Sequence, residues 1–206
     1  MKLIDISQRL NSSTPVWPGD SPFSFSLNWS KEETGSVNVG KISFSAHTGT
    51  HIDAPFHFDD NGRRVADLPL DSFFGKALVV DLTGRESIGA DDLEGLDLEG
   101  VTKLLIRTGS WEDRNAFPDK ITYLQKSAGP LLKEKGINLI GVDVPSVDPL
   151  NSKNLPAHHS LQSNGIGILE GIVLDGVEPK TYELSAFPLS LEEGDGCPVR
   201  AVLIDR

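Results

Sequence analysis

The chain has 206 residues, and its 19 basic and 30 acidic side chains give a formal net charge of −11. This acidity disfavours binding to nucleic acid or to an anionic membrane, because both need clustered cations and Arg63–Arg64 is the only basic pair that stands out. A chain of this size buries roughly 70% of the surface that its unfolded form exposes, so a core can form without disulfides or a structural metal. We place no domain boundary and expect one domain over residues 1–206.

No segment is typical of a secretion signal or a membrane span. Asp5 and Arg9 interrupt the N-terminal stretch, and no later run approaches the roughly 20 apolar residues that cross a bilayer. The single cysteine, Cys197, cannot form an internal disulfide, in agreement with a reducing compartment. These features favour a cytoplasmic protein.

Strand signals dominate the hydrophobic pattern. Apolar and polar residues alternate over 23–29 and over 42–46, which is the period of a sheet with one buried face. Continuous apolar runs are typical of more deeply buried strands. They occupy 77–80, 104–106, 139–142 and 166–169, and 199–204 is a predicted final strand.

Helical signals are confined to the middle of the chain. Apolar residues at helical spacing predict a helix over 119–128. A second short helix is predicted after Gly129–Pro130, ending with lysines in its last turn and Gly136 as its cap. A shorter helix is predicted to begin at Ser87 or Ala90. The sum is a β-rich α/β domain whose early strands are antiparallel and whose middle strands are separated by helices.

Three of the five histidines lie in one eleven-residue segment, from His47 to His57. Even spacing would place His47, His51 and Asp53 on the same side of an extended strand. A helical HExxH zinc site is disfavoured, because no Glu follows His47 and the segment contains a glycine and a proline. Imidazole and carboxylate ligands suit zinc and similar divalent ions, and Asp53 can bridge two ions. The alternative is that these residues form a solvated polar strand face or a hydrogen-bonded turn. The occurrence of His47, His51, Asp53 and His57 together makes this the weaker interpretation.

The remaining two histidines, His158 and His159, are adjacent, and Glu170 ends an apolar run. A buried, unpaired acid is costly, and a metal ion would remove that cost. The alternative is that Glu170 turns to solvent at the end of its strand. The first histidine cluster favours the metal.

The segment HTGTHIDAPFH, residues 47–57, resembles the signature of the metal-dependent cyclase-like amidohydrolase family. The resemblance covers nearly the whole chain. It extends to Pro15–Asp20, Gly141–Pro149, Ala157–His159, Ile168–Glu170 and Cys197–Val202. Two departures are minor: Thr50 stands where some members carry Ala, and Cys197 where many carry Ser, and neither is an expected ligand.

The resemblance implies a swivelling β/β/α fold, a homodimer and a site for two zinc ions, with manganese as the possible substitute. The ligands that it implies are His47, His51, Asp53, His158 and Glu170. It makes Asp53 common to both ions. It favours His158 over His159, because the family spaces its histidine and glutamate twelve residues apart.

The activity implied is hydrolysis of an aryl formamide, N-formylkynurenine, to kynurenine and formate in tryptophan breakdown. The resemblance gives His57 the acid/base role and places Trp17 against the substrate ring. The residues alone leave Trp17 open to a second interpretation, an apolar anchor for its loop. Asp143, Ser146 and Asp148 either support the site or form an ordinary turn.

Two other functions stay open. One is a different amide- or imide-hydrolysing member of the family, such as a manganese-dependent enzyme that opens isatin, although the loop Pro15–Asp20 resembles the formamide-hydrolysing version. The other is a non-catalytic metal-binding module. His57 argues against that module, since a structural zinc site needs four closed ligands and gains nothing from another titratable group.

Overall fold

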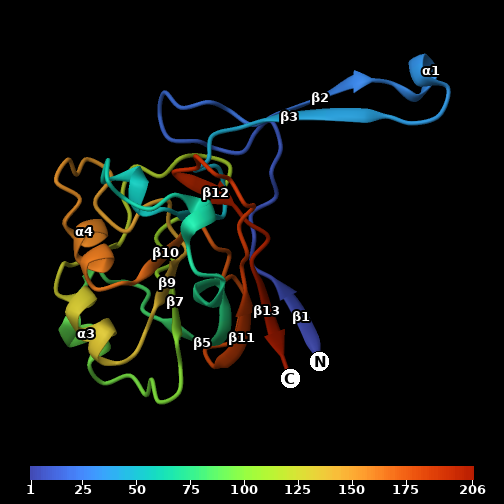
Figure 1. The fold of residues 1–206 in the computed structure, drawn as a ribbon. Helices are drawn as coiled ribbons and strands as arrows, with labels where there is room; N and C mark the ends of the chain where they lie inside the picture. The colour runs from blue at the N-terminus through green and yellow to red at the C-terminus, as the bar shows by residue number, and fades with distance from the viewer.

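A nine-stranded mixed sheet, in the order β1-β13-β11-β5-β7-β9-β10-β4-β12, runs through the computed structural model, which describes all residues from 1 to 206 (Figure 1). The strands of this sheet are β1 (Lys2–Asp5), β4 (His51–Asp53), β5 (Phe74–Asp81), β7 (Lys103–Arg107), β9 (Leu139–Val142), β10 (Gly167–Glu170), β11 (Thr181–Ser185), β12 (Gly196–Pro198) and β13 (Val202–Asp205). Two strand pairs stand outside it, β2 (Ser24–Trp29) with β3 (Val39–Ser43) and β6 (Ser87–Ile88) with β8 (Tyr123–Leu124).

The helices are short and lie mostly in the connections. They are α1 (Lys31–Thr34), α2 (Ala90–Leu93), α3 (Ala128–Glu134) and α4 (Pro156–Ser163), with 3₁₀ turns at Pro55–His57, Val65–Asp67 and Leu70–Phe73. None of the helices has the length and apolar character that crossing a membrane requires. The mixed α/β, strand-rich class predicted from the sequence is confirmed.

Four adjacent strands, β5, β7, β9 and β10, are parallel. They correspond to the continuous apolar runs of the sequence, which are typical of strands buried on both faces. Along β7, Leu104 and Ile106 belong to one apolar core and Leu105 to the other. The helices α3 and α4 pack against each other on the side of the first core (Figure 1). The predicted strands of this region are therefore confirmed.

The predicted helix over 119–128 is wrong. Residues 123–124 form β8, which pairs in parallel with β6, and the Thr122 hydroxyl donates to the carbonyl of Arg85. Ile121 and Leu124 are buried in the first core by this extended segment, so apolar spacing that fits a helix serves an extended chain here. The next helix, α3, begins at Ala128 and holds Pro130 in its first turn, where a missing N–H has little effect.

The other two helix predictions are close to the structure. The α3 helix is followed by Gly136 at φ +81°, as its predicted cap requires. Of the two starting points considered for the short helix, Ala90 is right, since Ser87 belongs to β6.

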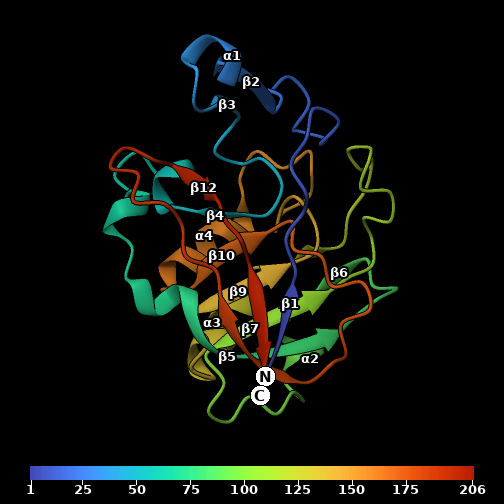
Figure 2. The same ribbon diagram turned by 90° about the vertical axis from the view of Figure 1, so that its right-hand side faces the viewer.

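The β2–β3 hairpin, with α1 at its tip, projects away from the rest of the molecule as an arm (Figures 1 and 2). Its strands are antiparallel as expected, with Phe25 opposite Ile42. The expected buried face is wrong, however, because every residue of both strands is exposed. Alternation predicts which side chains share a face, and in the arm no part of this chain covers that face. The apolar side chains on it remain 36–60% exposed: Phe25, Leu27, Trp29, Val39 and Ile42.

Candidate metal centre and active site

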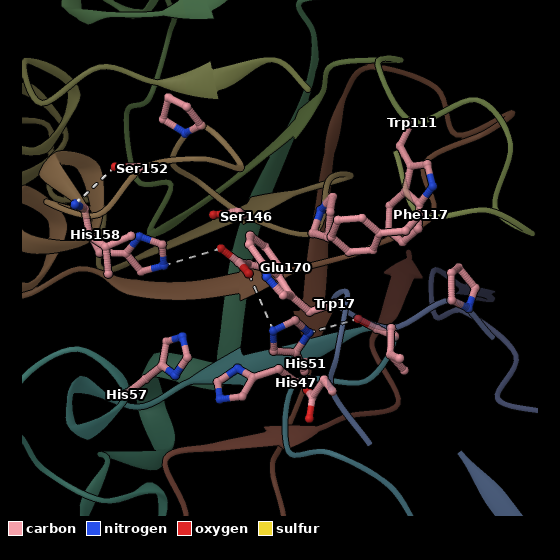
Figure 3. A pocket seen from close by; sticks show the side chains of 17 residues that line it. Trp17, His47, His51, His57, Trp111, Phe117, Ser146, Ser152, His158 and Glu170 are labelled. Atoms are coloured by element: carbon pink, nitrogen blue, oxygen red, sulfur yellow. Dashed lines mark hydrogen bonds and ion pairs between the residues drawn. The ribbon is translucent and has the colours of Figure 1, made fainter. Parts of the chain in front are cut away.

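The strand β4 carries two of the expected ligands into the sheet between β10 and β12. Its antiparallel register with β10 sets His51 directly opposite Glu170 and Asp53 opposite Ile168. Opposed residues point to the same face of a sheet, and so do residues two apart on one strand. The side chains of His51, Asp53 and Glu170 therefore converge on one face, and all three are buried. Figure 3 shows Glu170 between His51 and His158.

His47 reaches the same centre from a turn rather than from the strand. The strand begins only at His51, and Gly49 in the turn has φ +68°, a conformation that glycine adopts without strain. The Thr50 hydroxyl donates to the carbonyl of Gly171 at 2.7 Å, which fixes the turn to the end of β10. The expectation of one shared strand face is thus right for His51 and Asp53 and wrong for His47.

The α4 helix carries the remaining expected ligand, His158. Leu155, immediately before the helix, has φ +41°, a strained value for a residue with a side chain. The buried Asp148 carboxylate accepts the backbone N–H groups of Ala157 and His158, both at 3.0 Å. A carboxylate is favourable at the amino end of a helix, so Asp148 holds this turn and with it His158. The adjacent His159 is exposed, in agreement with the preference for His158.

The donor atoms of these residues lie at the spacing of ligands that share an ion. His51 Nε2 is 3.4 Å from Asp53 Oδ1 and 3.5 Å from Glu170 Oε2. His158 Nε2 is 3.5 Å from Asp53 Oδ2 and 3.7 Å from Glu170 Oε1. Two tetrahedral ligands, each about 2.0–2.1 Å from a zinc ion, are themselves about 3.3–3.4 Å apart. Each of the two carboxylates thus presents one oxygen to His51 and its other oxygen to His158.

Asp53 Oδ2 is buried and has no hydrogen-bond partner in the protein. Such an oxygen lowers the free energy of unfolding by about 1–3 kcal/mol unless another group binds it. Two sets of donors meet at this carboxylate, His47–His51–Asp53 and Asp53–His158–Glu170, and within each set the donor atoms lie within 4.8 Å of one another. Imidazole and carboxylate donors in these numbers fit a metal cofactor, with Asp53 common to both sets.

Each of the three histidines of the candidate centre has one ring nitrogen held by another group, which leaves the other nitrogen to face the centre. His51 Nδ1 donates to the carbonyl of Gly49 at 2.9 Å. His158 Nδ1 is 2.7 Å from Asp148 Oδ2, and His47 Nε2 is 3.1 Å from Asp195 Oδ2. Carbonyls and carboxylates in this role fix the orientation of metal-binding imidazoles.

The histidines and carboxylates of the centre shift one another's pKa values. Burial alone would lower the pKa of His47, but hydrogen bonds with Asp195 and Asp53 raise it to about 9. The same balance between burial and carboxylates raises the pKa of His51 and of His158 to about 10. Burial would raise the pKa of Asp53, and the three histidines instead hold it well below its usual range. Without a metal ion the three histidines are therefore protonated at neutral pH beside the ionised Asp53 carboxylate, and a metal ion would replace their protons.

His57 lies beside this cluster and differs from it. Its side chain is 36% exposed, its ring centroid is 3.9 Å from that of His47, and its Nδ1 is 3.7 Å from Asp195 Oδ2. Burial and the neighbouring His47 lower the pKa of His57, although Asp53 has the opposite effect. The imidazole is consequently neutral at neutral pH and can accept a proton. With His47 and Asp195 it also forms a third group of possible donors.

A cavity of about 320 Å³ opens onto the cluster, and Trp17 forms part of its wall. Trp17 is 41% exposed, and its ring meets Phe117 edge to face, with centroids 5.2 Å apart. The buried Trp111 stands behind Phe117 at 6.4 Å and donates its indole N–H to the carbonyl of Ala116. Figure 3 shows Trp111 and Phe117 on one side, His57 and His158 on the other, and Trp17 between them. Trp17 is thus a partly exposed residue of the cavity wall.

The loop after β9 resolves into three different roles. Asp148 holds His158, and Ser146 lines the cavity. Asp143 accepts the backbone N–H groups of Thr108 and Gly109 at 2.9 Å and so fixes the loop after β7, away from the ligands. Of the three residues, Asp148 and Ser146 thus lie at the candidate site, whereas Asp143 serves only to fix a neighbouring loop.

Sequence reasoning missed Asp195, Trp111 and Phe117. Asp195 is 148 residues from His47 along the chain, so no local pattern connects them. A weak signal was present next to it. A side chain at Gly196 would come within 2.6 Å of the His47 ring, so the glycine before Cys197 marks a close approach.

Comparison with known proteins gives three main findings. The family model described as "Putative cyclase" matches residues 4–149. A curated protein named "Kynurenine formamidase" from Geobacillus thermodenitrificans is 58% identical over 200 residues, which span 97% of this chain and 96% of that protein. A solved structure titled as a potential metal-dependent hydrolase with cyclase activity is 28% identical, with a TM-score of 0.84 over 100% of this chain and 98% of that one.

A more distant neighbour shares the fold alone. Isatin hydrolase A from Labrenzia aggregata has a TM-score of 0.84 at 23% identity, over 100% of this chain and 94% of that one. The family match covers well over half of the sequence, and the likeness to the curated relative is nearly full-length. The chain belongs to the cyclase family of metal-dependent hydrolases.

Proposed function

We propose that this enzyme hydrolyses N-formylkynurenine to kynurenine and formate in tryptophan catabolism, with residues 1–206 acting as one hydrolase domain. The observation that carries the proposal is the meeting of four ligand-type side chains around a fifth, Asp53, at the end of an aromatic-walled cavity. The formamidase name of a relative with 58% identity supports the substrate. An aryl formamide needs an activated water, a polarised carbonyl and a proton for the leaving nitrogen, and the centre can supply each.

The metal would be held as two ions, with Asp53 shared between them. The ligands of one ion would be His47, His51 and Asp53, and those of the other Asp53, His158 and Glu170. Divalent ions there would lower the pKa of a water molecule and polarise the formyl carbonyl. Nitrogen and carboxylate donors suit zinc best among the common ions, and manganese is the second candidate.

His57 would act as the general base and then as the general acid. It is neutral at neutral pH and lines the cavity beside the ligand cluster, while Asp195 lies near its Nδ1. Its Nε2 would accept a proton as water attacks the formyl carbon, and return the proton to the aniline nitrogen as the C–N bond breaks. The products are then formate and a free aryl amine. Such proton transfer contributes about 10²- to 10⁴-fold in rate.

Trp17 would contact the aromatic ring of the substrate. Trp17 is partly exposed in the cavity wall, and Phe117 contacts its ring edge to face. Stacking of a substrate ring on this indole would orient the formyl group toward the ligand cluster.

The arm supports a homodimer. Its two strands present one continuous, exposed apolar face. A two-stranded hairpin is only marginally stable alone, and exposed apolar patches of this kind mark interaction sites. Aromatic side chains bury about 150–250 Å² each, so two arms and the surfaces that receive them reach the roughly 1,200–2,000 Å² of a stable interface. We therefore propose that each arm packs against a second copy of this chain.

The test is an assay of N-formylkynurenine hydrolysis before and after chelation, with bound metal measured in the same sample. We expect activity that chelation removes and that zinc restores. Isatin serves as the competing substrate, because an isatin hydrolase shares the fold at 23% identity. Turnover of isatin without turnover of the formamide would overturn the proposed substrate, and stoichiometric metal without either activity would indicate a binding module.

A further inference from the structure

The cavity contains one charged side chain besides the histidines and Glu170, and that side chain is Asp20. No lysine or arginine lines the cavity. The Asp20 carboxylate accepts one hydrogen bond, from the backbone N–H of Ser21 at 2.6 Å, and takes part in no ion pair with a lysine or arginine of this chain. An anion at the wall of an otherwise mostly apolar cavity is thus free to bind a cation of the ligand.

A tight turn fixes Asp20 relative to Trp17. The four residues of the turn read Trp17-Pro18-Gly19-Asp20, and the N–H of Asp20 donates to the carbonyl of Trp17 at 2.9 Å. Gly19 has φ +92°, so proline and glycine occupy the two central positions that a type II turn prefers. The end residues of such a turn have their Cα atoms less than about 7 Å apart. A ligand whose ring contacts Trp17 therefore places its ring substituents within reach of Asp20.

We propose that Asp20 recognises an ammonium group carried by the substrate and so selects amino-acid aryl formamides over uncharged or purely anionic ones. This inference rests on the proposed function, because N-formylkynurenine bears an α-ammonium on the substituent beside its formamide. With the formyl group at the histidine cluster and the ring against Trp17, that ammonium would lie on the side of the Asp20 turn. The cavity offers no cation to the neighbouring carboxylate of the substrate, so discrimination depends on the ammonium.

The test compares two substrates in three proteins. The substrates are N-formylkynurenine and its analogue that lacks the α-amino group but keeps the ketone and the carboxylate. The proteins are the wild type, Asp20→Asn and Glu134→Gln. The Asn side chain keeps an oxygen for the Ser21 N–H and therefore preserves the turn. Glu134 is an exposed acid on α3 outside the cavity, so its variant changes the net charge equally without touching the site.

We expect the ratio of kcat/KM for the amino substrate to kcat/KM for the deaminated one to fall about tenfold in Asp20→Asn, the lower end of what a charge-assisted hydrogen bond provides at an accessible site. In Glu134→Gln the ratio should equal that of the wild type. Melting temperatures and metal contents of the three proteins are measured alongside.

An unchanged ratio in Asp20→Asn overturns the inference, even if both rates fall together, since Asp20 would then act only by holding the turn. A wild-type enzyme that turns over both substrates equally well overturns it too. If the wild type hydrolyses neither aryl formamide, the proposed function itself fails and the role of Asp20 falls with it. A fall of the ratio in Glu134→Gln as large as in Asp20→Asn would show a general charge effect rather than local recognition.

Discussion

Asp148 offers the sharpest test of the proposed metal ligands. Its carboxylate is fully buried and accepts three hydrogen bonds, from the N–H groups of Ala157 and His158 and from His158 Nδ1 at 2.7 Å. In Asp148→Asn an NH₂ group replaces one acceptor oxygen and faces donors. The His158 ring then loses the partner that directs its Nε2 toward Asp53 and Glu170.

The size of the effect follows from these contacts. Removing a partner that orients a metal-binding histidine typically costs about 10- to 100-fold in metal affinity, or about 1.4–2.7 kcal/mol. Each buried donor left without an acceptor costs about 1–3 kcal/mol, so the free energy of unfolding of the metal-free protein should fall by roughly 2–4 kcal/mol.

Asp143 supplies a matched control for Asp148. It is also buried, in the same loop, and accepts hydrogen bonds from Thr108 and Gly109, but it touches no ligand. Asp143→Asn should therefore lose similar stability in urea unfolding and keep wild-type metal affinity in a chelator competition titration. Equal metal affinity in all three proteins, or a loss confined to Asp143→Asn, would refute the assignment of Asp148 to His158.

Four further predictions concern the reaction, the charges and the arm. His57→Ala should keep its metal while kcat falls by about 10²-fold or more, as for loss of a general acid/base; a metal-free variant would instead make His57 a ligand. Trp17→Ala should lose about 1–3 kcal/mol in kcat/KM for the aromatic substrate with little change in Tm, since the side chain is 41% exposed; a large fall in Tm with normal turnover would return it to the anchor role. Metal binding at pH 7 should release protons, because the ligand histidines have pKa values of about 9 and 10 in the metal-free protein and must be neutral to bind; apparent affinity should then rise with pH up to about 10, and calorimetry that shows no proton release in buffers of different ionisation enthalpy would contradict this. Leu27→Ser with Trp29→Ser should give a folded monomer in sedimentation, because both side chains are exposed within one chain; a dimer of unchanged affinity would exclude the arm from the interface.

The parallel strands were predictable because they are buried on both faces, which leaves continuous apolar runs in the sequence. The absence of a helix from residues 119–127 was not predictable. Three apolar residues at helical spacing also fit an extended segment that hydrogen-bonds to distant residues such as Arg85. The arm shows a different limit. Its alternation correctly predicts a strand with one apolar face, yet whether a face is buried depends on what packs against it.

The candidate site divides in the same way. Its ligand-type residues could be found because His47, His51 and Asp53 lie close together in the sequence and match a known signature. The groups that orient those ligands could not, because Asp195 meets His47 only through the pairing of β12 with β4. Residues that act through tertiary contacts leave no local pattern.

The distribution of the proposed ligands along the chain has a consequence for maturation of the enzyme. One donor set comes from residues 47–53, whereas His158, Glu170 and the orienting Asp195 belong to the last quarter of the sequence. During synthesis the early segment leaves the ribosome more than a hundred residues before its partners, and β4 has neither neighbouring strand to pair with until then. The complete centre can therefore form only after the whole sheet has assembled. Metal binding would then be a late event, which stabilises a fold that has already formed and does not nucleate folding.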